Sequence, residues 1–238
     1  MKKLIKRLIG LIVLAVIVAS SAVWYTGYKE YTKLIEESSV QSKMDEVRAY
    51  KHYVPYDTIP TFFLDATVAV EDERFYSRNL PIDVQAILRA TWVNIKSLSL
   101  EQGGSTIPQQ VAKNLYLDNS TSFVKKVTEY YLTKDVLKEL SKQEILTTYV
   151  NIIYYGNGGY GVQHASRNYF ELNVWELNEG ELSILAGLPQ APSVYDLTQN
   201  FDLARQRQKH VLYRLEQSGK INKETADNIL KEEIKGYE

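Results

Sequence analysis

The sequence predicts a mostly α-helical protein, with one folded domain behind an N-terminal membrane-spanning helix. Three observations predict this class. Residues 8–28 contain no charged side chain, apolar residues recur at helical spacing through most of the remaining chain, and few segments alternate as strands do. The length of 238 residues, with 45% of them hydrophobic, is ample for a full hydrophobic core.

The composition excludes several classes of function. The net charge of −1 gives no overall field that would attract nucleic acid, so we expect no nucleic-acid partner. The chain has no cysteine, which excludes disulfides, a thiol nucleophile and a cysteine metal site. Its three histidines, His52, His164 and His210, show no ligand spacing, which argues against a zinc site.

The N-terminal segment predicts a retained membrane anchor. Residues 1–7 are rich in lysine and arginine, which places this end in the cytoplasm, and residues 8–28 are long enough to span a bilayer. Trp24 and Tyr28 then mark the outer interface. The alternative is a signal peptide cleaved at the small residues 20–22, but the apolar run is longer than a usual signal core. Either alternative places the rest of the chain outside the cytoplasm, as a single-pass protein of the cell membrane if the anchor is retained.

The part of the chain after the anchor divides into two segments. Residues 29–52 are charged and contain serine, and we expect a helical stalk or linker. Residues 53–238 form the predicted folded domain.

The first helix of that domain carries a candidate general base. A helical stripe contains Leu64, Val68, Glu71 and Phe75. Glu71 thus lies on the apolar face, while Glu73 points elsewhere. Burial would raise the pKa of Glu71 toward the working range of a general base. The alternative is a glutamate at the edge of the stripe, paired with Arg74 or Arg78.

The stretch 102–110 predicts a glycine turn that leads into a helix. Two adjacent glycines permit close approach of a ligand to the backbone, and Thr106 or Ser105 can cap a helix in which Pro108 occupies the first turn. The free N–H groups of such a helix start suit an anion. Gln109, Gln110 and Lys113 favour a polar ligand site over the alternative, an ordinary loop-to-helix junction.

A third cluster lies on a long helix that Ser122 is expected to cap. Lys125 and Lys126 precede Glu129 by four and three residues, so each can neighbour this glutamate. Taken alone, such a cluster indicates a solvated ion-pair face.

The other elements are expected in the following order. They are a helix over 81–95, a loop over 96–101, a helix over 109–117, a helix from the capping box Ser141-Lys-Gln-Glu144 to Asn151, a turn over 154–161, a helix over 162–168, a helix over 179–188, and two helices from about Asp202 that are divided at Gly219.

Five blocks together resemble the peptidoglycan glycosyltransferases, the family of monofunctional cell-wall transglycosylases and of the N-terminal domains of class A penicillin-binding proteins. The blocks are Glu71-Asp-Glu-Arg-Phe75; Gly103-Gly-Ser-Thr-Ile-Pro-Gln-Gln110; Lys125-Lys-Val-Thr-Glu129 with Ser141-Lys-Gln-Glu-Ile-Leu146; Tyr149-Val-Asn151 through Gly156 to Tyr169-Phe170; and Glu181 through Leu185-Ala-Gly-Leu-Pro189 to Pro192-Ser193. Their order behind a membrane anchor makes the resemblance specific.

The resemblance implies a lysozyme-like helical fold and polymerisation of lipid II into β-1,4-linked glycan strands. The transfer is inverting, and undecaprenyl diphosphate leaves. Glu71 would be the general base, and Glu129 a second acid that assists the diphosphate, with a divalent metal such as Mg²⁺ or Mn²⁺ as a possible cofactor bound there. The implied substrate-binding residues are Asp72, Phe75, Ser105, Thr106, Gln109, Gln110, Lys113, Lys125, Lys126 and Asn151. The implied partners are lipid II, the lipid-linked glycan strand, the membrane and other cell-wall synthesis proteins.

The chain departs from the family's pattern near the first block. The family usually has histidine near Arg78 and glycine near Leu80, and this chain has about one extra residue before Asp83. Pro108 replaces a commoner threonine, which a first helical turn tolerates. Thr121 stands near a position where some relatives place arginine.

Two other functions stay open at this point. A lysozyme-like glycoside hydrolase would use the same two carboxylates as acid and base, but it would need no diphosphate cradle. A non-catalytic scaffold of the wall-synthesis machinery would share the fold, although it would have no use for both glutamates and the glycine turn.

Overall fold

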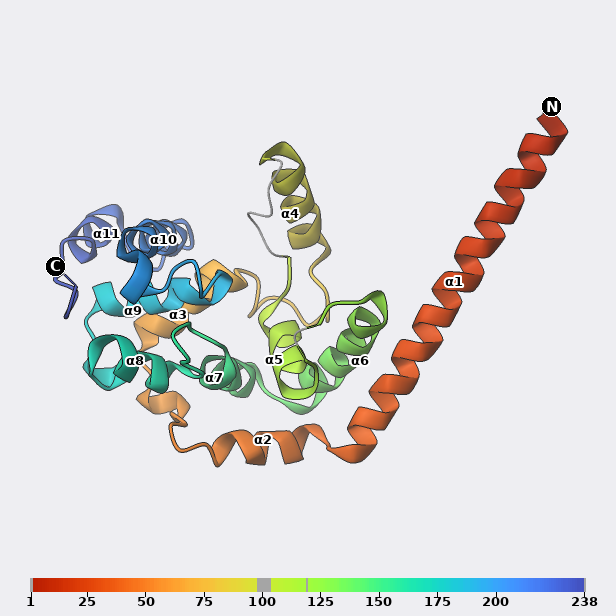
Figure 1. The fold of residues 1–238 in the computed structure, drawn as a ribbon. Coiled ribbons are helices and arrows are strands. Elements are labelled where there is room, and N and C mark those ends of the chain that lie inside the picture. The colour runs from red at the N-terminus through yellow and green to blue at the C-terminus, as the bar shows by residue number, and fades with distance from the viewer. Residues whose placement is uncertain (1, 98–103, 119, 238) are drawn as a thin grey trace.

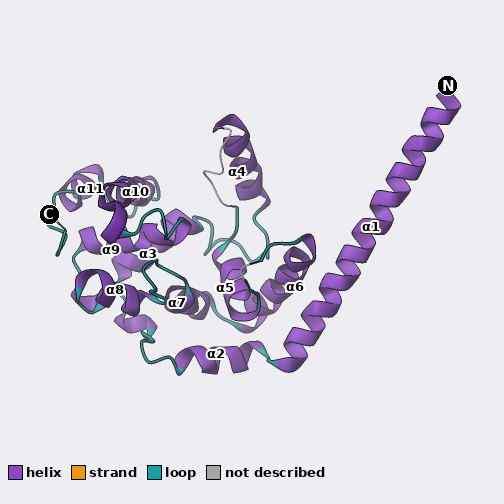
Figure 2. Cartoon of the chain, in the orientation of Figure 1, coloured by secondary structure: helices purple, strands orange, loops and turns teal. Residues whose placement is uncertain are grey.

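The protein is described by a computed structural model that covers residues 2–97, 104–118 and 120–237. The described residues form helices and contain no strand longer than an isolated bridge, which confirms the mostly α-helical prediction (Figures 1 and 2). The α-helices are α1 (Lys2–Glu37), α2 (Val40–Arg48), α3 (Thr61–Glu71), α4 (Val84–Ser97), α5 (Ile107–Tyr116), α6 (Phe123–Glu139), α7 (Lys142–Ile152), α8 (Val162–Phe170), α9 (Glu179–Gly187), α10 (Leu197–Gln217) and α11 (Lys223–Ile229). Single 3₁₀ turns are η1 (Tyr56–Thr58), η2 (Val174–Glu176) and η3 (Leu188–Gln190).

The predicted anchor is the first part of a single long helix. Helix α1 has 36 residues and leaves the body of the molecule, so that the N-terminus lies at its far end (Figure 1). Its most apolar window has a mean hydropathy of 2.4 and is unburied, and by length and composition it can cross a membrane. The helix does not end at residue 28 but continues to Glu37, because residues 29–37 contain neither proline nor glycine.

The segment predicted as a stalk is helical but packs against the body. Helix α2, which is capped by the Ser39 side chain, buries Val40, Met44 and Val47. Their spacing forms one apolar stripe, which lies against α6 and α7. No free-standing linker is therefore seen between residues 29 and 52.

The core is built around α3, which packs against both α9 and α10. Helix α9 is buried from Gly180 to Gly187, and Asn178 caps its N-terminus in a capping box with Glu181. On the other side, α5 packs against α6 and α7. These contacts bring the ends of α3 and α5 together with α6, the three helices that carry the candidate site.

Helix α4 stands apart from this core and projects from the body (Figure 1). It begins at Val84 rather than Pro81, and Val84, Leu88 and Trp92 are exposed. The loop expected over 96–101 starts later, because the helix continues to Ser97, and residues 98–103 lie outside the described part of the chain. Gln102 and Gly103 of the predicted turn fall in this range.

The remaining helix predictions are confirmed, with small differences at their ends. The side chains of Ser122 and Ser141 cap α6 and α7, and Ser141 forms the expected capping box. The C-terminal pair is divided at Gly219, whose φ of +71° suits glycine. Helix α10 starts earlier than predicted, at Leu197, because Asp196 caps a turn that is joined to the main helix across a break at Asn200.

Candidate active site

Glu71 is the last residue of α3, and its carboxyl group is nearly buried. The side chain is 10% exposed, Gln110 on α5 donates a 2.9 Å hydrogen bond to Oε2, and Nη2 of Arg207 on α10 lies 3.9 Å from Oε1. Neither Arg74 nor Arg78 pairs with it; both bind other carboxylates. The alternative of an ion pair with these two arginines is therefore wrong.

Burial raises the pKa of Glu71, and its neighbours modulate that effect. Gln110, Arg207 and Tyr149 lower this pKa, while the charge of Asp72 raises it further, and the net direction is upward. Glu73 provides the contrast: hydrogen bonding to Arg214, at 2.5 Å, lowers its pKa, and its side chain is 41% exposed. A carboxyl group of raised pKa, aimed inward, suits a general base.

Two neighbours of Glu71 were not predicted. Tyr149 on α7 is fully buried beside Glu71, whose pKa it lowers. Arg207 is 9% exposed and donates from Nε to the Gly187 carbonyl at 3.1 Å. Tyr149 lies in one of the five sequence blocks, and this position could have indicated that it belongs to the site. No local pattern distinguishes Arg207 from the other arginines of α10.

The described part of the glycine turn leads into α5 as predicted. The Thr106 hydroxyl accepts from the Gln109 N–H, the Gln109 Oε1 accepts from the Thr106 N–H, and Pro108 lies in the first turn. Thr106 is buried by this capping box, while Ser105 is exposed. Of these two predicted ligand-binding hydroxyls, the structure presents Ser105 to solvent and uses that of Thr106 as a cap.

The second acid, Glu129, is 3% exposed and lies beside that cap. Nζ of Lys126 donates to both of its oxygens at 2.8 and 2.9 Å, and Nε2 of Gln109 donates to Oε1 at 3.1 Å. Lys125 does not join them, since its ammonium group binds Asp118 and Ser120. Of the two expected lysine–glutamate neighbours, only Lys126 is therefore confirmed. Lys113 borders the small hollow that also contains Lys125, Lys126 and Glu129.

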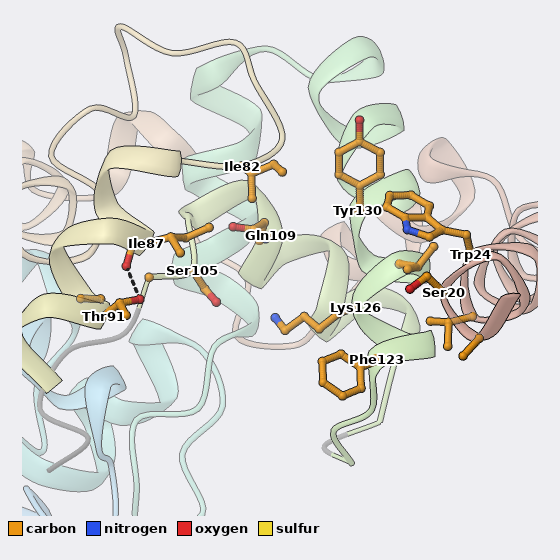
Figure 3. A pocket seen from close by; sticks show the side chains of 15 residues that line it. Ser20, Trp24, Ile82, Ile87, Thr91, Ser105, Gln109, Phe123, Lys126 and Tyr130 are labelled. Atoms are coloured by element: carbon orange, nitrogen blue, oxygen red, sulfur yellow. Dashed lines mark hydrogen bonds between the residues drawn. The ribbon is translucent and has the colours of Figure 1, made fainter. Parts of the chain in front are cut away.

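A cleft of about 900 Å³ opens between residues 104–109, α4, α6 and the middle of α1. Figure 3 shows the Lys126 side chain extending from α6 toward Ser105 and the glycine turn. The apolar lining comes from Trp24, Ile87 and Phe123, among others. Glu71 does not line this cleft; it lies behind the first turn of α5, joined to it through Gln110.

Three of the predicted substrate-binding residues make contacts within the protein. Asn151 is buried and exchanges hydrogen bonds with the Val54 backbone at 2.8 and 2.9 Å. Phe75 is fully buried, and it lies beyond the end of α3 because the helix stops at Glu71. Asp72 binds Arg78 and the Ile107 N–H with its carboxylate.

The residues around Glu129 do not by themselves form a metal site. Within the described chain, no group of three His, Asp or Glu side chains is placed to hold a metal ion. Glu129 is also neutralised by Lys126. A divalent ion would therefore need substrate oxygens for most of its ligands.

The fold and the site together define a class of protein. A buried carboxyl group of raised pKa, a cleft with a lysine beside a helix N-terminus, and an apolar helix long enough to cross a membrane are the features of a helical membrane enzyme. The family model described as Transglycosylase matches residues 37–216, and the chain belongs to this family.

Named relatives agree with this assignment. A protein named as a transglycosylase from Cupriavidus necator is 40% identical over 81% of this chain and 84% of its own length. Penicillin-binding protein 1A of Neisseria flavescens is 39% identical over 77% of this chain, and penicillin-binding protein 2D of Bacillus subtilis is 36% identical over the same share. The matched residues make up only 23% and 26% of these two proteins. Among solved structures, penicillin-binding protein 1A from Haemophilus influenzae has a TM-score of 0.47 and 26% identity over 76% of this chain and 17% of that one.

Proposed function

We propose that this protein is a peptidoglycan glycosyltransferase that polymerises lipid II into β-1,4-linked glycan strands. The observation that carries the proposal is the chain of contacts from Glu71 through Gln110, along the first turn of α5, to Gln109, Glu129 and Lys126. It links a base of raised pKa to a cation beside a helix N-terminus, which are the two groups that glycosyl transfer from a diphosphate requires.

In the proposed reaction, Glu71 removes the proton from the 4-hydroxyl of the acceptor sugar. The hydroxyl oxygen attacks C1 of the lipid-linked strand as the bond from C1 to the diphosphate oxygen breaks. Undecaprenyl diphosphate leaves with the electron pair of that bond, and the single displacement inverts an α-linked donor to a β-linked product. Burial serves this step, because a carboxylate of raised pKa is a stronger base than an exposed one.

The diphosphate would bind at the polar end of the cleft. Lys126 and Ser105 reach into it, and the positive end of the α5 helix dipole lies beside them. Lys113 and Lys125 lie further along the same face of the site. Glu129 would hold Lys126 in place. It is also the residue that would help to hold a Mg²⁺ or Mn²⁺ ion, which would supply further positive charge.

The lipid portion of the substrate would follow the apolar side of the cleft. Phe123 is 84% exposed and Trp24 is 48% exposed, and both face the space between α1 and α4. A single membrane span with the N-terminus in the cytoplasm would place this apolar side of the cleft at the outer membrane surface. Binding to other cell-wall synthesis proteins is a prediction from the resemblance.

The test is incubation of the detergent-solubilised protein with labelled lipid II and Mg²⁺, followed by separation of polymer from substrate. We expect polymer from the wild type and none from Glu129→Gln. Release of soluble fragments from purified wall, without polymer, would instead indicate the hydrolase, and neither product would indicate the scaffold.

A further inference from the structure

The loop between α3 and α4 contains a buried ionic network that the proposed reaction does not use. Arg78 donates from Nη1 and Nη2 to the two oxygens of Asp72, at 2.9 and 2.6 Å, and from Nη1 to Asp83 at 2.9 Å. The side chains of these three residues are between 3% and 10% exposed. Arg78 is also a position at which the chain departs from the pattern of the family it resembles.

The network extends outward from Arg78 to Arg74 in the same loop and to the helices α4 and α7. Arg74 binds the second oxygen of Asp83, and Asp83 accepts from the Ala86 N–H at the start of α4. The Lys142 ammonium group, from α7, binds the Arg78 carbonyl. Arg78 is thus held at its backbone as well as at its guanidinium group, which fixes the direction in which the group points.

Asp72 connects this network to the site. It directly follows Glu71, and its Oδ2 accepts from the Ile107 N–H at 3.1 Å. Ile107 is the first residue of α5, the helix that carries Gln109 and Gln110. One carboxylate therefore fixes the end of α3 against the beginning of α5, and Arg78 holds that carboxylate with a bidentate pair.

We propose that Arg78 is a positioning residue, which holds Asp72 so that Glu71 and the first turn of α5 keep a fixed separation. The inference rests on the proposed function for its catalytic consequence. A guanidinium group is suited to this role because its planar fork can satisfy both oxygens of Asp72 while the same Nη1 reaches Asp83. Lysine offers a single ammonium group and cannot reproduce the fork.

The network also has an electrostatic consequence for Glu71. The charged and titratable groups that act on this residue are Asp72 on its own chain segment, Arg207 on α10, and Tyr149 and Tyr155 from α7 and the turn after it. Asp72 raises the pKa of Glu71. Without Arg78 the charge of Asp72 would be uncompensated, and the pKa of Glu71 would rise further.

The test compares full-length Arg78→Gln, Arg78→Lys and the double variant Arg78→Gln, Asp72→Asn in lipid II polymerisation between pH 5 and 9. For Arg78→Gln we expect kcat to fall at least about tenfold, with KM changed by less than about threefold, because the reacting groups are misplaced by a fraction of an ångström. In this variant, the acidic limb of the pH profile of kcat, which reports protonation of Glu71, moves to higher pH. In the double variant, the acidic limb returns to the pH of the wild type or to a lower pH, because Asp72→Asn removes the unpaired negative charge.

Arg78→Lys separates the charge of Arg78 from its shape. We expect the wild-type acidic limb, because the positive charge is retained, but a lower kcat, because the fork is lost. This variant also decides the matter if Arg78→Gln does not fold. A wild-type kcat and profile in either single variant would overturn the proposal, as would a loss of kcat in Arg78→Gln with an unmoved acidic limb.

A second readout does not depend on the reaction. Amide hydrogen exchange over residues 104–110, followed by mass spectrometry, should be faster in Arg78→Gln than in the wild type, because the bond from the Ile107 N–H to Asp72 is weakened. Exchange over α11 serves as the internal control and should not change. A wild type that makes no polymer would refute the proposed function alone, whereas unchanged exchange over residues 104–110 would refute the role of Arg78.

Discussion

At the scale of single residues, three helices converge on the Glu71 carboxyl group. Its inward direction could be predicted from the sequence, because Leu64, Val68 and Glu71 share one stripe of α3. Its partners could not all be predicted. Arg207 lies on a helix far along the chain, and only the packing of α3 against α10 brings the two together. Local spacing contains no information about such a pair.

Arg207 should influence the pH at which Glu71 becomes protonated and can no longer act as the base. It lowers the pKa of Glu71 against the upward effect of burial. Replacement by methionine removes this opposing effect, so the pKa of Glu71 rises and the acidic limb of the kcat/KM profile moves to higher pH. Arg207→Lys keeps the charge and should move the limb less. A methionine variant with the wild-type limb would contradict this account of Glu71.

At the scale of elements, the sequence predicts helix ends better than helix neighbours. The caps at Thr106, Ser122 and Ser141 are local hydrogen bonds between residues three apart, and all are present. The docking of α2 was not predicted, because an apolar stripe shows that a helix packs but not against which partner. The same holds for Asn151, whose partner Val54 lies almost a hundred residues earlier.

The cap of α5 should matter for both stability and reaction. Thr106→Ala removes the side-chain acceptor of the first turn and should lower the free energy of unfolding by about 1 kcal/mol. It should also slow polymerisation, because the lost bond holds the backbone N–H of Gln109, whose side-chain amide binds Glu129. Asn222→Ala, at the cap of the remote helix α11, is the matched control. It should cost similar stability and leave the rate unchanged; equal rates in the two variants would contradict the prediction.

Contact between α1 and α6 provides a second prediction at this scale. A Cβ atom on Gly27 would lie 2.7 Å from the Val127 Cβ and 2.8 Å from the Val124 carbonyl oxygen. Gly27→Leu should therefore push α1 away from α6 and destabilise the protein by about 1–3 kcal/mol, measured by thermal unfolding in detergent. Gly10, in the same helix, has no neighbour within 4 Å, so Gly10→Leu should have no such effect. Equal melting temperatures for the two variants would show that α1 does not pack as described.

At the scale of the whole molecule, the anchor and the catalytic domain form a continuous structure. The sequence predicts the apolar helix from its composition alone, but not its junction with the domain. There Tyr31 donates a 2.6 Å hydrogen bond to Asp135, and Thr128 donates to the Gly27 carbonyl at 3.1 Å. Because α6 also carries Lys126 and Glu129, the helix that meets the anchor is the helix that would hold the diphosphate.

The chain's lack of cysteine makes its orientation directly testable. Lys3→Cys and Lys209→Cys each introduce one exposed thiol, at opposite ends of the molecule. In intact cells, a membrane-impermeant maleimide should label the cysteine at position 209 and not that at position 3, and lysis should make both reactive. Labelling of position 3 in intact cells would reverse the proposed topology.

The central claim is that Glu71 is the base of a lipid II polymerase, and one comparison tests it most directly. The rates of polymerisation by Glu71→Gln and Glu73→Gln are measured beside the wild type, because these two glutamates lie on the same segment and differ in burial and pKa. We predict a loss of at least about 100-fold for Glu71→Gln, as removal of a general base requires, and a change of only a few-fold for Glu73→Gln. Polymerisation by Glu71→Gln at the wild-type rate would contradict the account.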